Sequence, residues 1–367
     1  MMTFSPIDHS MMQQAIHLAR KGIYTTAPNP NVGCVIALND EIVGQGYHAK
    51  AGEPHAEVHA LKEAGSKSKG ATAYVTLEPC SHYGRTPPCA EALIKAGVTK
   101  VICAMVDPNP SVSGRGITML QQAGIDVSHG LLEQDARDLN PGFIKRMERG
   151  KPFVRLKMAA SLDGRTALKN GESKWITGTK ARQDVQHYRA KSSAILSTSS
   201  TVITDNASLN VRMSELPSHV QERLPAQQLR QPLRVILDRQ QQLTPDLKLF
   251  ESGEQPLIVC VGTDSEHTVS INASSAGFDL DELLTTLAAR YQINDIWVEA
   301  GATLAASLVE QNLVDEFILY LAPKLMGSDS RGLLNMIGLE KMSEVLELNI
   351  SDVRMIGQDI RIIATPI

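Results

Sequence analysis

Residues 54–57 read Pro54-His55-Ala56-Glu57, residues 73–77 read Ala73-Tyr74-Val75-Thr76-Leu77, and Pro79-Cys80 and Cys89 follow. An imidazole, two thiols and a carboxylate are the groups that hold and use a catalytic zinc ion, because three protein ligands leave a fourth position for water. Bound zinc lowers the pKa of that water from about 15.7 to about 7, which makes hydroxide available at neutral pH. The stretch therefore predicts zinc ligands at His55, Cys80 and Cys89 and proton transfer by Glu57.

The order of these residues is typical of one class of zinc enzyme. His-x-Glu followed by Pro-Cys and a second Cys is the pattern of the zinc deaminases of nucleobases. Two other interpretations are open. His55 and the two cysteines are the sort of residues that also pack in a core, and His55 with His59 forms an i,i+4 pair like that of a metalloprotease. In the metalloprotease motif the Glu directly follows the first His, whereas Glu57 comes one position later. We expect His59 to pack or to make a local hydrogen bond.

Composition excludes several classes of protein. The chain has 367 residues, 43% hydrophobic and 21% charged, which predicts two globular domains. Its formal charge of −4 gives no basic surface for a nucleic acid. No apolar run reaches the roughly 18 residues of a membrane span, and no signal-peptide core is present at the N-terminus. The five scattered cysteines favour the reducing cytoplasm over a disulfide framework.

Strands alternate with helices and short Gly-rich joints, which predicts sheets layered between helices. A Pro- and Gly-containing basic segment at 140–152 marks the boundary between predicted domains 1–150 and 151–367. Residues 213–232, rich in Gln, Pro, Ser and charge, predict a surface excursion. The predicted helices are 8–22, 56–64, 89–96, 115–123 and 179–191, and the predicted strands are 32–38, 73–77, 100–105, 153–159, 193–197, 233–237, 256–261, 295–299 and 315–321.

The first 150 residues resemble the pyrimidine deaminase half of the bifunctional deaminase–reductases of riboflavin biosynthesis. The resemblance lies in four runs: Pro28 to Gly33, His48 with Gly52 to Glu57, Glu78 to Cys89, and Asp107 to Pro110. Cytidine and tRNA adenosine deaminases usually have Cys-x-x-Cys, so the eight residues between Cys80 and Cys89 favour this family. The resemblance implies a three-layer, cytidine-deaminase-like zinc domain. It also implies that Asn29 and His48 hold the pyrimidine ring and that Arg85 grips the ribose phosphate.

In the second half, the residues alone indicate less. A strand, a glycine and a helix start at 296–304 offer free N–H groups to a phosphate, but no Gly-x-Gly-x-x-Gly follows an early strand. The runs 157–164, 173–177 and 322–327 resemble the reductase half of the same family.

This second resemblance implies a dihydrofolate-reductase-like domain with a mixed sheet that uses NADPH. By position, the expected cofactor contacts are Ala159, Trp175, Thr201, Asp205, Gly301, Ala302, Thr303 and Leu304. The expected substrate contacts are Ser173, Arg189, Leu209, Arg212 and Glu299. Lys157 and Asp163 are the ionisable groups to test as proton donors, and the alternative is a structural pair at a strand end.

Together the two halves predict a bifunctional riboflavin biosynthesis enzyme. Its substrates would be 2,5-diamino-6-(5-phosphoribosylamino)pyrimidin-4(3H)-one for deamination and 5-amino-6-(5-phosphoribosylamino)uracil for reduction of the ribosyl group. Its cofactors would be Zn²⁺ and NADPH, with no nucleic acid or membrane partner, and we expect a homo-oligomer formed through the reductase domains. The alternatives are a tRNA adenosine deaminase with an accessory domain and a non-catalytic zinc protein with a nucleotide-sensing domain.

Overall fold

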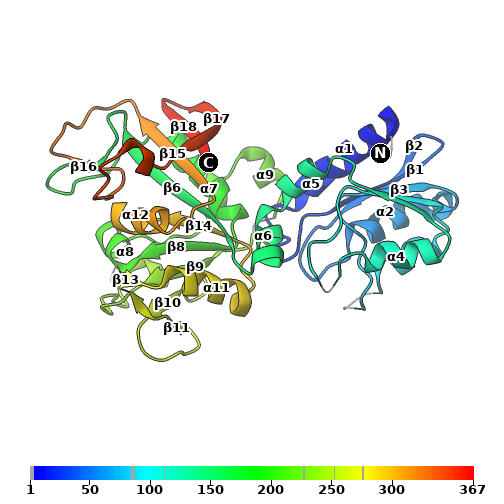
Figure 1. The fold of residues 1–367 in the computed structure, drawn as a ribbon, viewed down its shortest axis with the longest axis horizontal. Coiled ribbons are helices and arrows are strands. Elements are labelled where there is room, and N and C mark those ends of the chain that lie inside the picture. Colours follow the sequence, from blue (N-terminus) through cyan, green and yellow to red (C-terminus); the bar gives the residue numbers. More distant parts are fainter. Residues whose placement is uncertain (1–3, 84–86, 111, 226–227, 252, 275–276) are drawn as a thin grey trace. The chain divides into compact units, whose positions relative to one another are not determined.

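A computed structural model describes residues 4–83, 87–110, 112–225, 228–251, 253–274 and 277–367. The chain divides into two compact units, Met1–Gly150 and Lys151–Ile367 (Figure 1). Each unit has hydrophobic clusters of its own. Among the described residues, no helix is both long and apolar enough to cross a membrane.

The first unit is built on a five-stranded sheet of described residues in the order β2-β1-β3-β4-β5. β1 is antiparallel to β2 and β3, whereas β3, β4 and β5 are parallel. The strands are β1 (Gly33–Leu38), β2 (Glu41–Tyr47), β3 (Thr72–Val75), β4 (Lys100–Cys103) and β5 (Asp126–His129). The helices are α1 (Pro6–Ala19), η1 (Arg20–Gly22), α2 (Ala56–Ala64), η2 (Gly65–Ser68), α3 (Cys89–Lys95), α4 (Arg115–Gln122), α5 (Glu133–Leu139) and α6 (Pro141–Arg149).

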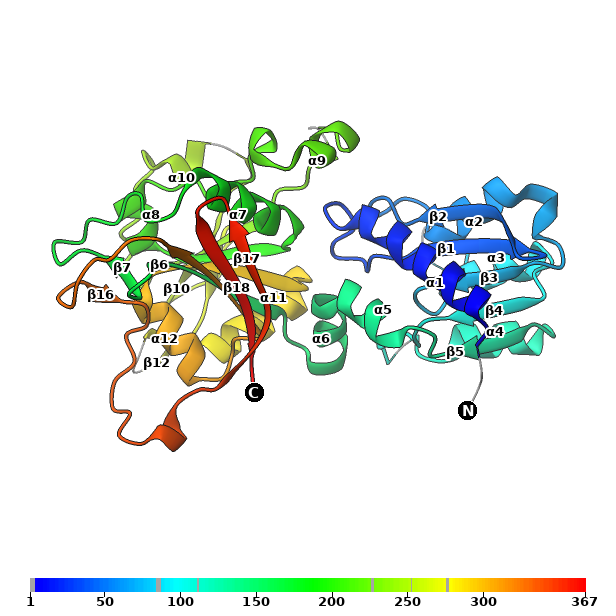
Figure 2. The ribbon, with the colours of Figure 1, turned by 90° about the horizontal axis from the view of Figure 1, so that it is seen from above.

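Helices cover both faces of this sheet. Because side chains alternate along a strand, Cys34 and Ile36 of β1 join one core with α2, α3 and α4. Val35 and Ala37 join the opposite core with α1, α5 and α6 (Figure 2). The predicted three-layer, cytidine-deaminase-like arrangement is confirmed.

Two helices lie very close to the sheet because glycines face them. A Cβ on Gly33 would come within 1.9 Å of the Ala15 carbonyl of α1, and one on Gly44 within 2.2 Å of the Ala60 carbonyl of α2. These contacts allow α2, which begins directly after His55, to pack against β2. The close packing fixes the place of the first candidate site.

The second unit contains a nine-stranded sheet of described residues in the order β11-β10-β9-β8-β14-β6-β15-β18-β17. The strands from β11 to β15 in this order are parallel, and β18 and β17 are antiparallel, so the predicted mixed sheet is confirmed. Its strands are β6 (Phe153–Ser161), β8 (Ala194–Thr198), β9 (Leu233–Leu237), β10 (Leu257–Cys260), β11 (Thr268–Ser270), β14 (Asp295–Glu299), β15 (Glu316–Ala322), β17 (Leu348–Ile356) and β18 (Asp359–Pro366). Short pairs join β7 (Arg165–Ala167) to β16 (Arg331–Gly332) and β12 (Ala273–Ser274) to β13 (Gly277–Phe278).

Helices also cover both faces of the large sheet. Ile296 and Val298 of β14 join a core with α11 and α12, while Trp297 points to the opposite core with α7. There Trp297 stacks on Tyr188, with ring centroids 4.8 Å apart. The helices are α7 (Thr179–Lys191), α8 (Ser199–Asp205), η3 (Met213–Glu215), α9 (Ser218–Arg223), α10 (Lys248–Glu251), α11 (Leu280–Tyr291), α12 (Ala302–Glu310) and η5 (Met342–Glu344).

The helix α6 lies within the segment 140–152, where we predict the boundary between the two domains. Pro141 stands at the first position of α6, where its missing N–H is not needed. Gly150 ends the helix in the left-handed conformation, with a φ of 66°. A proline and a glycine that indicate a linker in the sequence are therefore the two ends of a helix.

Candidate active sites

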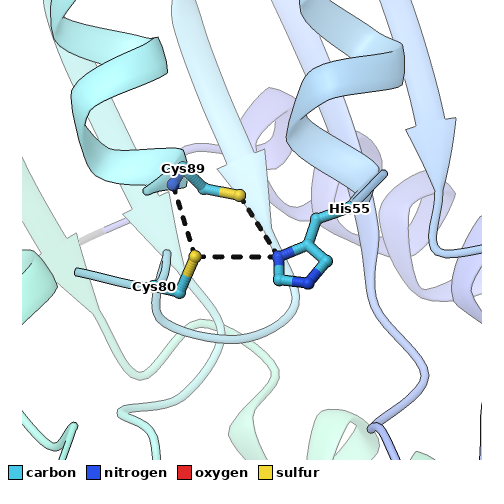
Figure 3. A group of neighbouring side chains, drawn as sticks. All are labelled: His55, Cys80 and Cys89. Atoms are coloured by element: carbon cyan, nitrogen blue, oxygen red, sulfur yellow. Dashed lines mark hydrogen bonds between the residues drawn. The ribbon is translucent and has the colours of Figure 1, made fainter. Parts of the chain in front are cut away.

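Three segments of the first unit bring together the predicted metal ligands. His55 is the N-cap of α2, Cys80 follows β3, and Cys89 is the first residue of α3. His55 Nδ1 lies 3.6 Å from the Cys80 Sγ and 3.4 Å from the Cys89 Sγ (Figure 3). The three ligand atoms lie within 4.8 Å of one another, and no fourth His, Cys, Asp or Glu of the described chain joins this group. This geometry matches the three-ligand set of a catalytic zinc site.

The local electrostatics favour a thiolate at Cys80. Hydrogen bonding from Cys89 has the largest effect and, with the His55 ring, lowers the pKa of Cys80 to about 4 despite its burial. The Cys89 backbone N–H also donates to the Cys80 Sγ at 3.3 Å. Because the thiolate is the form that binds metal, this site is prepared for zinc.

Glu57 lies on the first turn of α2 with only 3% of its surface exposed. Burial raises the pKa of this carboxyl group. Its Oε2 is buried and has no hydrogen-bond partner among the described residues. A buried polar atom of this kind is costly unless something satisfies it, and water on a metal held by the adjacent ligands would do so. The donor set and this orphaned oxygen both fit zinc.

Two predicted substrate contacts lie beside the zinc ligands. The His48 ring is buried and sits 5.2 Å from the His55 ring. Its Nδ1 is 3.3 Å from the Pro54 carbonyl and its Nε2 is 3.2 Å from the Asn29 Nδ2. We assign Nδ1 as the donor and Nε2 as the acceptor, since burial lowers the pKa of His48 and favours the neutral ring. Arg85 lies outside the described residues.

His59 does not take part in the metal group. It lies on α2, and a Cβ on Gly46 of β2 would come within 2.6 Å of the His59 Cβ. His59 therefore packs against the sheet, and its Nε2 has no hydrogen bond in the described part of the chain. The arrangement gives no support to a metalloprotease-like His pair.

The second unit contains a cavity of about 560 Å³ at the starts of α8 and α12 and the end of β9. Four predicted cofactor contacts line it, namely Thr201, Gly301, Thr303 and Leu304. Ala302 is the first residue of α12 but is not among the lining residues. Among the lining residues that the sequence did not indicate as cofactor contacts are Ser199, Ser200, Arg239 and Phe278. Arg239 comes two residues after the buried strand β9, at the edge where ligands bind in parallel sheets, and this signal could have found it.

The other predicted cofactor contacts lie outside the cavity lining. Trp175 is 64% exposed, and the Arg182 guanidinium lies 4.5 Å from its ring centroid. Asp205 pairs with Lys174 at 3.3 Å. Ala159 lies on β6, partly buried against the core that contains α7.

Two of the predicted substrate contacts bind each other. Arg189 Nε and Nη2 donate to the two Glu299 carboxylate oxygens at 2.5 and 2.9 Å. Arg189 Nη1 donates to the Asn210 carbonyl at 3.0 Å, and the Trp297 indole N–H donates to Glu299 at 2.8 Å. Burial acts to raise the pKa of Glu299, but the Arg189 guanidinium outweighs it and holds that pKa at about 2.

The remaining predicted substrate contacts vary in accessibility. Leu209 is 2% exposed, and its φ of 51° lies in the left-handed region. Arg212 pairs with Glu215 through Nε at 2.5 Å and Nη2 at 2.9 Å. Ser173 is partly exposed in the segment before α7.

The two candidate proton donors differ. Lys157 lies on β6 in register with Glu299 of β14, and burial lowers its pKa. The Asp163 carboxylate accepts from the Ser161 hydroxyl and from the Met326 and Gly327 N–H groups. These hydrogen bonds, that of Ser161 first, lower the pKa of Asp163 to about 2. This low pKa favours the structural alternative for Asp163, in which its hydrogen bonds hold the loop after β15.

Comparison with known proteins agrees with both sites. The model of the cytidine and deoxycytidylate deaminase zinc-binding region matches residues 5–105, and that of the RibD C-terminal domain matches residues 152–362. The riboflavin biosynthesis protein RibD of Escherichia coli is 53% identical over 359 residues, covering 96% of this chain and 98% of its own.

Solved structures extend over the same range. Form 1 of Acinetobacter baumannii RibD aligns with a TM-score of 0.92 at 48% identity, covering 98% of this chain and 99% of its own. The diaminohydroxyphosphoribosylaminopyrimidine deaminase/5-amino-6-(5-phosphoribosylamino)uracil reductase of Thermotoga maritima aligns with a TM-score of 0.83 at 31% identity, with the same coverage.

The fold and the sites thus define a zinc-dependent deaminase joined to a reductase. The chain belongs to the RibD family of riboflavin biosynthesis enzymes. Its cofactors are Zn²⁺ and NADPH, as predicted, and the predicted family and bifunctional activity are confirmed. Neither the tRNA deaminase nor the non-catalytic alternative agrees with a full-length match to this family.

Proposed function

We propose that the unit 1–150 converts 2,5-diamino-6-(5-phosphoribosylamino)pyrimidin-4(3H)-one to 5-amino-6-(5-phosphoribosylamino)uracil, and that the unit 151–367 reduces the ribosyl group of this product. The name of the T. maritima protein, which aligns over 98% of the chain, supports these substrates. The convergence of His55, Cys80 and Cys89 beside the orphaned Glu57 carboxylate is the observation that carries the deaminase assignment.

In the deaminase reaction, His55, Cys80 and Cys89 would hold zinc, which supplies a water of lowered pKa. Glu57 would take a proton from this water and deliver it to the exocyclic amine, so that water enters and ammonia leaves. Its raised pKa suits this work, because the carboxyl group must carry a proton at one stage and release it at another. Asn29 and the neutral His48 would hold the ring beside the metal.

In the reductase unit, NADPH supplies the hydride, and the 560 Å³ cavity would hold it. Gly301 caps α12 without a side-chain hydrogen bond, so the first N–H groups of this helix can receive a phosphate. Arg239 is the one cationic side chain among the described residues that line the cavity. We assign it to the 2′-phosphate that distinguishes NADPH from NADH.

We place the substrate of this unit beside Glu299. Lys157 is its register partner on β6, and Arg189 binds both of its carboxylate oxygens. Arg189 and Glu299 would set the shape of the substrate pocket, with Ser173, Leu209 and Arg212 around it. Lys157 would donate the proton that accompanies hydride transfer, since its lowered pKa eases proton release.

The two assignments are tested on the purified full-length chain with the diaminopyrimidine phosphate, with and without NADPH. Ammonia release and NADPH oxidation are followed separately. Glu57→Ala should abolish ammonia release, retain zinc and still oxidise NADPH when the aminouracil is supplied directly. Glu63→Ala, on the exposed side of the same helix, is the matched control and should retain both activities. Wild-type protein that binds zinc but releases no ammonia would contradict the deaminase assignment.

The partner that we propose for the reductase unit is a second copy of the chain. The strand β17 ends the nine-stranded sheet, and its Ile350, Val353 and Met355 share one face and are 58–63% exposed. Asp352 and Arg354 flank Val353, so antiparallel pairing of two β17 edges about Val353 would place each Arg354 opposite an Asp352 of the other copy. An isologous contact of this kind is the usual basis of a homodimer.

Sedimentation of wild type and Val353→Lys tests this contact. We expect wild type to be a dimer and Val353→Lys to be a monomer. In the proposed contact the two introduced lysines would face each other across the two-fold axis, and their charges would repel. Glu310→Lys, at the exposed end of α12, introduces the same residue elsewhere and should remain dimeric. A monomeric wild type at micromolar concentration would exclude the proposal. The compartment is the cytoplasm, in agreement with the five free cysteines.

A further inference from the structure

The buried carboxylate of Glu78 lies two residues before the zinc ligand Cys80 and has no part in the chemistry described above. It is 3% exposed. Its Oε1 accepts hydrogen bonds from the backbone N–H groups of Gly116 and Ile117 at 2.8 and 3.2 Å. Its Oε2 accepts from those of Asp107 and Gly114 at 3.1 and 2.9 Å. One side chain therefore satisfies four backbone donors.

These donors belong to the start of α4 and to the loop before it. Gly114 is the N-cap of α4 and has no side chain with which to cap the helix. Glu78, in the segment that follows β3, supplies the missing cap, and its negative charge lies at the positive end of the helix dipole. The carboxylate thus joins the segment 107–117 to the turn that carries Cys80.

The same turn is pressed against α4 by its backbone. A Cβ on Gly116 would come within 2.0 Å of the Pro79 carbonyl oxygen, so only glycine allows this approach. On its other side, Cys80 is tied to the start of α3. The Ala90 N–H donates to the Cys80 carbonyl at 3.2 Å, and the Cys89 N–H donates to the Cys80 Sγ at 3.3 Å. Cys80 is held between the first turns of two helices.

We propose that Glu78 is a positioning residue of the deaminase site, which fixes the Glu78-Pro79-Cys80 turn against α4 and so sets the place of the Cys80 sulfur. Metal sites tolerate deviations of only about 0.2 Å from ideal ligand distances. A small shift of this turn is therefore enough to weaken the site. Residues that orient metal ligands typically contribute about 10- to 100-fold to metal affinity or activity.

Glu78→Gln in the full-length chain is the direct test. The glutamine keeps the size of the side chain but replaces one of the two acceptor oxygens with an NH₂ group. This NH₂ group cannot accept the hydrogen bonds that the backbone N–H groups donate. We expect zinc affinity, measured by competition with a chelator, to fall about 10- to 100-fold. We also expect the thiolate-to-metal absorption of the Co²⁺-substituted protein to change. Glu63→Gln, the same change at the exposed end of α2, should leave both unchanged.

Gly116→Ala tests the proposal by a second route, because it leaves the Glu78 carboxylate intact. Alanine favours a helix by about 1 kcal/mol over glycine, so helix propensity alone predicts a more stable domain. The contact with the Pro79 carbonyl predicts weaker zinc binding and an altered Co²⁺ spectrum. NADPH oxidation with supplied aminouracil reports only that the second unit has folded, so folding of the first unit is followed separately by its own thermal transition in circular dichroism. The Gly116→Ala variant decides the question if Glu78→Gln fails to fold its first unit.

Unchanged zinc affinity and an unchanged Co²⁺ spectrum in a folded variant would overturn the proposal, even if its thermal stability fell. The proposal rests on the deaminase assignment, but the two fail differently. Wild-type protein that binds zinc without releasing ammonia contradicts the substrate assignment only. A Glu78 variant that binds zinc like wild type contradicts the positioning role only.

Discussion

The zinc site of the first unit and the cofactor cavity of the second are held together by different parts of the chain. At the zinc site, side chains do the holding: His55, Cys80 and Cys89 converge, and Glu57 and Glu78 are buried around them. The cavity is lined by residues of several separate segments, among them the starts of α8 and α12, and no small group of side chains dominates it. A single side-chain change should therefore disable the first site, whereas the second should lose affinity gradually.

The largest effect is expected from Cys80→Ala. The variant loses one of three ligands, so zinc content should fall and ammonia release should drop at least about 10³-fold, since the metal contributes several kcal/mol to the transition state. Metal analysis and an ammonia assay measure the two quantities. Cys103→Ala, in the same unit but outside the metal group, should retain zinc. If Cys80→Ala released ammonia at the wild-type rate without bound zinc, a single side-chain change would not disable the first site, and the contrast with the cavity would be wrong.

The second unit also has one place where side chains are decisive, the buried pair of Arg189 and Glu299. Arg189→Ala leaves the Glu299 carboxylate buried without its guanidinium, which should destabilise this unit by about 3–5 kcal/mol. Chemical denaturation followed by Trp297 fluorescence measures the loss. Arg290→Ala removes an exposed ion pair with Asp264 and should cost far less, because solvent screens the charges of this pair. Equal losses of unfolding free energy in the two variants would show that burial of the Arg189–Glu299 pair does not increase its contribution to stability.

The same pair predicts how the stability of the second unit depends on pH. Because the pKa of Glu299 is about 2 in the folded chain and near 4.5 when unfolded, the unfolded state binds more protons between these values. The stabilisation is complete above about pH 4.5 and is lost as the pH falls towards 2, on the order of 3 kcal/mol in total. Denaturation of wild type and Glu299→Gln across this range measures it. The variant should show a weaker dependence on pH, and parallel curves would exclude Glu299 as the source.

The smallest effect is expected at the cavity. Arg239→Ala should weaken NADPH binding about tenfold, as expected for the loss of one charge-assisted hydrogen bond. NADH binding should be unchanged, because NADH lacks the 2′-phosphate. Cofactor titration by fluorescence gives both constants, and Lys248→Ala, an exposed residue of α10 outside the cavity lining, serves as the control. Equal weakening of NADPH and NADH would place Arg239 against a part that the two cofactors share.

The difference between the sites also explains what could be predicted from sequence. The triad and Glu57 could be identified because zinc chemistry demands particular residue types at recognisable spacings. Arg239 was missed although it follows a buried strand, because that position alone does not distinguish it from a surface arginine. The sequence left the role of Asp163 open because its partners are the N–H groups of Met326 and Gly327, far away in the sequence. The helix α6 was missed because Pro141 and Gly150 mark helix ends as well as linkers.

The separate hydrophobic cores of the two units have a genetic consequence. Damage to the metal ligands of one copy leaves the reductase core of that copy intact, and the reverse also holds. We therefore expect two defective alleles, one lesioned in each half, to complement each other when expressed in the same cell. Such a pair of alleles would restore growth without added riboflavin, although each chain retains only one of the two activities.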